Sequence, residues 1–269
     1  MNRIPKKKTL LLAFFLGIFF IPAKAQKILS VQKISLRAPA DIKVDGKTTE
    51  WDNKFQAYNP ANRIFYTLSN DDDNLYLTVA STNDGYCFSK ILYGGITFTI
   101  QKGSKELKNI AITYPTVVKS LKGPIIDRDN ALRGFVKFND TTKSDVKKKR
   151  DSLVSIISEK LNDLFKEVKV EGIAETQEPL ISIYNAEGIK LSAQYNNHLQ
   201  YVYELAIPLK YLNSTIKNGE KLRYNIRLNG RPAMPGEVIY DDMYKSLGPD
   251  NMYVYTFTDL DGEYTLSKK

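Results

Sequence analysis

The sequence predicts an all-β protein: an antiparallel β-sandwich of the immunoglobulin-like or jelly-roll type with one amphipathic helical insertion. Three observations support this fold class: short segments of alternating apolar and polar residues, turn signals between them, and one stretch with helical spacing. In Ile96–Ile100 the apolar residues lie on one face and the threonines on the other. Further strands are predicted at Ile64–Leu68, Leu75–Val79, Leu107–Tyr114, Leu132–Phe138, Leu180–Tyr184, Ile189–Tyr195, Leu199–Ile207, Leu222–Leu228 and Met252–Thr258.

Residues 1–25 have the three parts of a secretory signal peptide. Three lysines precede an apolar run from Leu10 to Ile21, and Ala23-Lys24-Ala25 follows it. The run is shorter than the roughly 20 residues that a spanning helix needs, so we expect cleavage after Ala25. Retention as an N-terminal anchor is the alternative. No second segment has spanning length, so the mature chain is expected in the periplasm, cell envelope or medium of a bacterium without a membrane span.

Cleavage removes much of the positive charge. Five basic residues and no acidic one lie in the signal, so the formal charge falls from +9 to +4. The basic balance is therefore weak evidence for nucleic-acid binding, and none is expected. A single cysteine, Cys87, excludes an internal disulfide and a cysteine-rich zinc cluster.

The mature chain divides into an N-terminal strand or linker at 26–40 and one sandwich domain at 41–269. Within that domain, residues 142–168 place apolar side chains at helical spacing and predict the insertion. Lys147-Lys148-Lys149-Arg150 lies near its start, either as a solvated helix face or as a contact for an anionic surface. The apolar positions are Leu153, Ile157, Leu161, Leu164 and Val168.

Three motifs occur in order along the domain. They are VDGKTTEWD at Val44–Asp52, NDDDNLYL at Asn70–Leu77 and YELAIPL at Tyr203–Leu209. Asp-Gly marks a tight turn, because glycine accepts a positive φ, and proline ends the last strand. In this order and spacing they resemble the family 9 carbohydrate-binding modules over roughly Ile42–Leu266. The resemblance implies a β-sandwich with a non-catalytic binding role.

The sugar site of that family does not transfer residue by residue. The resemblance implies a clamp of two tryptophans around the sugar, but Ile91-Leu92-Tyr93 stands at the first position and Leu247 at the second. Trp51 matches a core position of the family. Tyr93 and Tyr244 lie in the two expected clamp loops and are the candidate ligand-binding residues, since a phenol ring offers a stacking face and a hydroxyl. The alternative is that these tyrosines, like others among the seventeen, only serve the strands.

The sequence gives little support for catalysis, and we expect no enzyme. The only histidine, His198, follows two asparagines at an expected hairpin turn. Related sandwich domains bind haem through histidine or methionine, but His198 with Met234, Met243 and Met252 gives no recognisable ligand pair, and no cofactor is expected. No nucleophile elbow, zinc-protease motif or phosphate loop occurs.

Asp71-Asp72-Asp73 raises the question of calcium. These residues lack the alternating ligand spacing and the central glycine of a calcium loop, so they are expected to close a hairpin. A structural calcium ion held by distant loops remains a hypothesis. The sequence thus predicts an exported binding domain that recognises a glycan, or, as the alternative, an envelope structural or protein-interaction domain that keeps the fold without the sugar site.

Overall fold

A computed structural model describes residues 28–101, 108–116, 144–212, 221–232 and 248–268. Five strands form sheet A: β1 (Ala57–Asn59), β2 (Ile64–Asn70), β3 (Asn74–Ser81), β8 (Lys190–Tyr195) and β9 (Tyr201–Pro208). Six form sheet B: β4 (Ile96–Gln101), β5 (Ile110–Tyr114), β6 (Glu167–Glu171), β7 (Leu180–Ser182), β10 (Leu222–Leu228) and β11 (Thr258–Tyr264). The helices are α1 (Gly85–Gly94), α3 (Ser144–Leu164), α5 (Gly248–Tyr255), and the short 3-10 turns η1 (Thr49–Trp51) and η2 (Leu209–Leu212).

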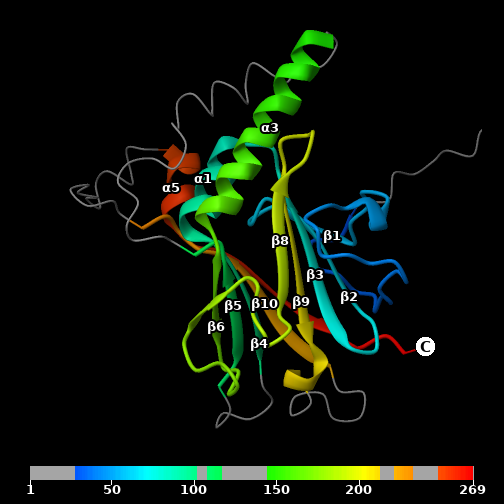
Figure 1. The fold of residues 1–269 in the computed structure, drawn as a ribbon. Coiled ribbons are helices and arrows are strands. Elements are labelled where there is room, and N and C mark those ends of the chain that lie inside the picture. The colour runs from blue at the N-terminus through cyan, green and yellow to red at the C-terminus, as the bar shows by residue number, and fades with distance from the viewer. Residues whose placement is uncertain (1–27, 102–107, 117–143, 213–220, 233–247, 269) are drawn as a thin grey trace, which may run out of the picture.

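The two sheets are antiparallel and face each other across a shared apolar core (Figure 1). The order is β1-β2-β3-β9-β8 in sheet A and β11-β10-β4-β5-β6-β7 in sheet B. In the centre, the hydroxyls of Tyr66 on β2 and Tyr224 on β10 share a 3.0 Å hydrogen bond. The predicted all-β sandwich is confirmed at this level.

Two sequence predictions of secondary structure are wrong in detail, and one helix was not predicted. Met252–Thr258 was expected to be a strand, but α5 continues to Tyr255 and the strand β11 begins only at Thr258. The helical insertion ends at Leu164, and Val168 is the first buried residue of β6, because alternation takes over there. Helix α1 was not predicted; its N-cap Asp84 accepts a 2.7 Å bond from the Cys87 N–H. The predicted strand Leu132–Phe138 lies outside the described residues.

The outer face of sheet A is covered. Residues 39–56, here called the covering segment, lie against it, and Figure 1 shows this part of the chain in blue beside β2 and β3. A Cβ at Gly46 would lie 3.1 Å from the Gln194 side chain of β8, and the Gln56 N–H donates to the Thr67 hydroxyl of β2. Strands β2, β3 and β9 are consequently buried along nearly their whole length, on both faces.

Among the described residues, none covers the outer face of sheet B. Strands β4, β5 and β10 alternate between buried and less buried residues along their length. One set of side chains therefore enters the core, and the other faces away from it. The two sheets differ in this respect, and only sheet B presents a face that the described part of the chain leaves uncovered.

Residues 28–38 correspond to the predicted N-terminal strand or linker. They form isolated parallel bridges to the edge of sheet A, at Leu29 with Ala57 and at Arg37 with Asn70, and no continuous strand. The Leu36 carbonyl accepts a 2.8 Å bond from the Tyr264 hydroxyl of β11. This segment therefore connects the margins of the two sheets.

Helix α3 packs on β8 at one end of the sandwich (Figure 1). Ile157 and Leu161 are buried against the sheets, and the Ser158 hydroxyl accepts a 3.1 Å bond from the Tyr195 N–H. Lys147, Lys148 and Lys149 are exposed, in agreement with a solvated helix face, but Arg150, the fourth residue of the predicted basic run, is buried at 9% exposure.

Candidate functional site

The sequence motifs meet on sheet A and hold the covering segment there. The Glu204 carboxylate, 2% exposed, accepts hydrogen bonds from the backbone N–H groups of Asp45 and Gly46, each 2.9 Å long. The Leu209 N–H, just past the proline, donates to the Asp73 carbonyl at 2.7 Å. Burial raises the pKa of Glu204 to about 7, although the two N–H donors act in the opposite direction. All three motifs thus form structural contacts that hold the covering segment and the β2–β3 hairpin in place.

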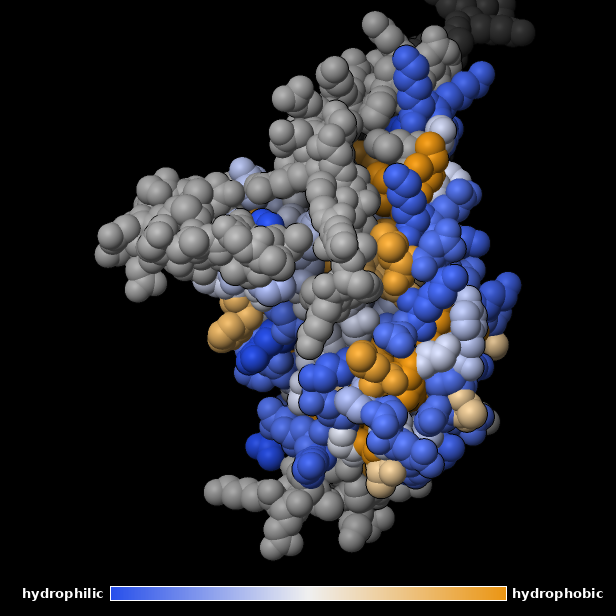
Figure 2. All heavy atoms as spheres, turned by 60° about the vertical axis from the view of Figure 1, so that its left-hand side comes forward, coloured by the Kyte–Doolittle hydropathy of each residue, from blue (hydrophilic) through white to orange (hydrophobic). Residues whose placement is uncertain are grey.

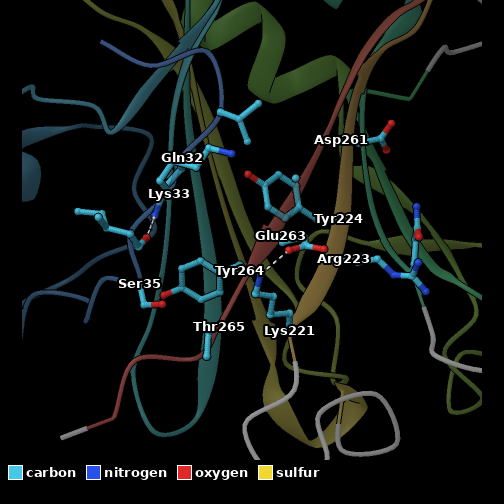
Figure 3. Close-up of a pocket in the computed structure, with 14 residues that line it drawn as sticks. Gln32, Lys33, Ser35, Lys221, Arg223, Tyr224, Asp261, Glu263, Tyr264 and Thr265 are labelled. Atoms are coloured by element: carbon cyan, nitrogen blue, oxygen red, sulfur yellow. Dashed lines mark hydrogen bonds and ion pairs between the residues drawn. The ribbon is translucent and has the colours of Figure 1, made fainter. Parts of the chain in front are cut away.

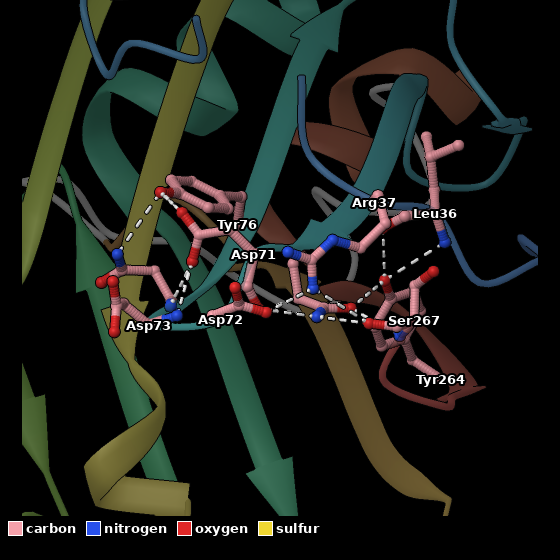
Figure 4. A network of polar contacts seen from close by, with 10 residues as sticks. Leu36, Arg37, Asp71, Asp72, Asp73, Tyr76, Tyr264 and Ser267 are labelled. Atoms are coloured by element: carbon pink, nitrogen blue, oxygen red, sulfur yellow. Dashed lines mark hydrogen bonds and ion pairs between the residues drawn. The ribbon is translucent and has the colours of Figure 1, made fainter. Parts of the chain in front are cut away.

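The aspartates of NDDDNLYL close the β2–β3 hairpin, as predicted (Figure 4). One Asp71 oxygen accepts the N–H groups of Asp73 and Asn74, and the other accepts the Tyr76 hydroxyl at 2.6 Å. Partial burial alone would raise the pKa of Asp71, but these hydrogen bonds lower it. Asp72 forms a 2.9 Å ion pair with Arg37. Across the described residues, no group of three or more acidic, histidine or cysteine side chains could hold a metal ion.

In the described part of the expected clamp region, helices α1 and α5 pack against each other. Tyr93 lies in the last turn of α1 and not in a loop, and the Arg231 guanidinium is 5.4 Å from its ring centroid. Lys90, also on α1, is fully buried, donates a 2.9 Å bond to Thr258 and lies 3.9 Å from the Tyr253 ring of α5. Burial lowers the pKa of Lys90 to about 8. Tyr244 and the cleavage residue Ala25 lie outside the described residues.

The other candidate residues behave as ordinary parts of the fold. His198 is exposed at the β8–β9 turn, where its N–H donates to the Asn196 side chain, as predicted. Cys87 is fully buried, and this burial raises the pKa of its thiol to about 12. A thiol with such a pKa stays protonated and is a poor nucleophile near neutral pH.

The open face of sheet B carries polar side chains in register. Strand pairing places the outward residues of β11, β10, β4, β5 and β6 side by side in rows that cross the sheet. The first row is Asp259, Arg227, Thr97, Thr113 and Lys169, and the second is Asp261, Asn225, Thr99, Ala111 and Glu171.

These rows enclose a hollow of about 530 Å³, which we call the trough. The threonines of β4 and β5 form its floor, whereas longer side chains on β10, β11 and β6 form its walls. Three inter-strand spacings separate β10 from β6, so the trough is about 14 Å wide between the backbones of its walls. A flat sheet becomes a groove here because short side chains lie between long ones.

Hydrogen bonds fix the trough side chains. Arg227 Nη2 lies 2.7 Å from Asp259 Oδ2, and Asn225 Nδ2 lies 3.0 Å from Asp261 Oδ1. The Asn229 amide donates to the Thr97 hydroxyl at 2.9 Å, and this hydroxyl also bonds Thr113 at 2.8 Å. Donors and acceptors therefore alternate over the surface in defined positions.

A second hollow of about 530 Å³ adjoins the trough (Figure 3). It lies between residues 31–35 and the edge strand β11, and Gln101 and Asp261 line both hollows. In it the Lys221 ammonium lies 2.7 Å from Glu263 and, by donating to it, lowers the pKa of that carboxyl. The two hollows together extend the polar surface from the centre of sheet B to its edge.

The trough was missed in the sequence for an identifiable reason. The outward residues of β4 and β10 were visible as the polar half of the alternation, but such residues occur on any solvated strand. The acidic residues of β11 did not indicate the trough, because the sequence of Thr258–Tyr264 did not predict a strand.

A comparison of the chain with protein-family models, curated proteins and solved structures found no match in any of the three. Within the described ranges, no helix is both long and apolar enough to cross a membrane.

Proposed function

We propose that the protein is an exported, non-catalytic binding domain that recognises a glycan in the trough of sheet B. The main support is the contrast between the sheets: the covering segment packs on sheet A, whereas the described residues leave the outer face of sheet B uncovered, hollowed and polar. A sugar presents many hydroxyls, each both donor and acceptor, and the trough offers amides, hydroxyls and carboxylates to match them.

The trough is also suited to binding because its side chains are already ordered. Asn225 and Arg227 are held by their acidic partners on β11, so little side-chain freedom is lost on binding. The immunoglobulin-like or jelly-roll type of the sandwich and its kinship with family 9 modules belong to the same proposal. They are supported by the meeting of the three motifs around Glu204 and the β2–β3 hairpin.

A binding experiment tests the proposal. The chain, exported with its own leader and purified, is applied to a glycan array and to insoluble polysaccharides. We expect retention on at least one glycan and an approximately tenfold weaker affinity for Asn225→Ala, because its amide would lose hydrogen bonds to the ligand. Lys190→Ala, an exposed change on β8 of sheet A, is the control and should bind normally. Absence of retention on every glycan would contradict the proposal.

The alternative, an envelope protein-interaction domain, has its own support. Figure 2, turned toward the β6 side of the molecule, shows apolar side chains gathered along a line on the surface. The exposed large side chains outside the trough include Ile156 on α3 at 48%, Leu180 on β7 at 47%, and Tyr184 at 83%. Crosslinking in intact envelopes that gives one discrete partner, lost in an Ile156→Ser/Tyr184→Ser variant, would favour this function.

A further inference from the structure

We propose that Thr97, Thr113 and Asn229 form a subsite of the trough that binds one free hydroxyl group of a neutral glycan. This hydroxyl would accept a hydrogen bond from a threonine and donate one to the amide oxygen of Asn229. The inference rests on the proposed glycan-binding function and names the class of ligand and the residues that select it.

The contacts of Asn229 fix the direction of its amide. Its Nδ2 donates to the Gly94 carbonyl and to the Thr97 hydroxyl, both at 2.9 Å. A carbonyl oxygen can only accept, so the amide nitrogen must face Gly94. The two bonds use both N–H donors of the amide, and the described residues place no donor on its oxygen Oδ1. This oxygen is therefore left as an acceptor for a ligand.

The backbone of Asn229 is held as closely as its side chain. Its N–H donates to the Gly95 carbonyl at 3.0 Å. A Cβ at Gly94, the last residue of α1, would lie 2.2 Å from the Asn229 carbonyl oxygen, so this close approach requires a glycine. The acceptor is thus in place before a ligand arrives, and little conformational freedom is lost on binding.

The two threonines supply the matching donor. Thr97 on β4 lies directly opposite Thr113 on β5, and their hydroxyl oxygens are 2.8 Å apart. Only one of their two protons can lie between the oxygens, so the other O–H can donate to a ligand. Because the amide nitrogen of Asn229 contacts Thr97, the amide oxygen also lies next to this pair. One sugar hydroxyl, which both accepts and donates, matches the two free groups.

The lining of the trough favours a neutral ligand. Arg227 lies 2.7 Å from Asp259, and Lys169 lies 3.1 Å from Glu171, so both cations already face a carboxylate. The remaining charge of the trough is that of Asp261, which is negative. An acidic sugar would therefore find no uncompensated cation. Among the described residues that line the trough none is aromatic, so the affinity comes from hydrogen bonds and not from ring stacking.

The trough accommodates more than one sugar unit. From Thr97 to Gln101 the floor extends along four residue steps of β4, which corresponds to about 13 Å. Thr99 and Gln101 add a further hydroxyl and a further amide, and Asn225 gives only one of its two amide N–H groups to Asp261. The ligand is therefore a neutral oligosaccharide or polysaccharide with free hydroxyls.

Affinity electrophoresis tests the subsite. Gels contain a soluble β-glucan, galactan or mannan, each unmodified or O-methylated, or the acidic polygalacturonate, and the dissociation constants come from the retardation. We expect the wild type to bind at least one unmodified neutral polymer. Its O-methylated form should bind at least tenfold more weakly, because a methyl ether cannot donate to Asn229. Polygalacturonate should also bind at least tenfold more weakly, because of its charge.

Matched variants locate the effect on the three residues. Thr97→Val/Thr113→Val keeps the β-branched shape without either hydroxyl and should weaken binding about tenfold. Asn229→Ala removes the acceptor and should weaken binding to a similar extent. Thr49→Val removes an exposed hydroxyl on η1, outside the trough, and should have no effect.

The outcomes separate the inference from the function on which it rests. Binding that is weakened by Asn225→Ala but not by Thr97→Val/Thr113→Val would overturn the subsite and leave glycan recognition in the trough intact. Equal binding of the O-methylated polymer by the wild type would also overturn the subsite, without any variant. Equal or tighter binding of polygalacturonate would overturn the neutral ligand class. If the wild type bound no polymer, the proposed function itself would fail. Unfolding curves of each variant, followed by Trp51 fluorescence, check that the fold is unchanged.

Discussion

Replacing Glu204 by glutamine is expected to remove a pH dependence from the stability of the protein. Glu204 is buried, and its carboxylate accepts the N–H groups of Asp45 and Gly46. The amide oxygen of glutamine can accept the same two hydrogen bonds without a charge. Leucine has a similar volume but no acceptor and serves as the contrasting variant.

The magnitude follows from the pKa of Glu204. Desolvation by burial raises it from 4.5 to about 7, and the nearby carboxylates of Glu50 and Asp45 add to the effect. The unfolded chain thus releases the proton at lower pH than the folded one. The stabilisation that protonated Glu204 contributes is present in full below pH 4.5 and is lost as the pH rises through about 7. The free energy of unfolding falls by about 3 kcal/mol in total over this range. Glu204→Leu should cost about 2–5 kcal/mol instead, because two backbone donors lose their acceptor.

Urea unfolding between pH 5 and 8 measures this effect. Trp51, the only tryptophan, lies in the covering segment and reports on its release. The wild type should lose unfolding free energy over this interval relative to Glu204→Gln, and the two should converge at the acidic end. Parallel pH profiles for the wild type and Glu204→Gln would refute the reasoning.

Three further predictions concern other contacts. Burial lowers the pKa of Lys90 from 10.5 to about 8, so between these pH values the unfolded chain binds a proton that the folded one has released, and the wild type should gain stability as the pH rises. Urea unfolding of Lys90→Met should lack this gain. Gly262→Ala should cost about 1–3 kcal/mol in denaturant unfolding, because its Cβ would lie 2.2 Å from Tyr224 Cζ, and Tyr224→Leu should reduce this cost. Asp71→Ala should lower the unfolding free energy by about 1–3 kcal/mol in thermal or urea unfolding, because the hairpin N–H groups and the Tyr76 hydroxyl lose their acceptor. An unchanged stability would contradict the role of Asp71 in the turn.

Alternation predicts the strands that have one buried and one solvated face. This is why β4 and β10 were found from sequence with nearly correct ends. Strand β11 carries three acids and a glycine, and its extended form depends on the ladder to β10 and on partners there such as Arg227 and Lys221. These contacts lie far along the chain and leave no local pattern.

The location of the candidate site could not be predicted from the sequence for the same reason: it depends on contacts between residues far apart in the chain. Which sheet face stays open depends on the path of the covering segment, and its anchor, Asp45 to Glu204, spans 159 positions. The motifs that suggested the family therefore identified the covered sheet, whereas the trough lies on the other one. Tyr93 was selected because of its place in the chain, and only the structure shows that it lies in the last turn of a helix.

The outward rows of sheet B can accept amino-acid substitutions without loss of the fold. Outward residues such as Thr99 and Asn225 contribute nothing to the interior, so substitutions there leave the burial of the core as it is. A library randomised at these positions should contain mostly folded members that differ in what they bind. Strands β2, β3 and β9 of sheet A offer little such freedom, because they are buried on both faces along nearly their whole length. Natural selection could diversify recognition on one sheet while the other keeps the architecture constant.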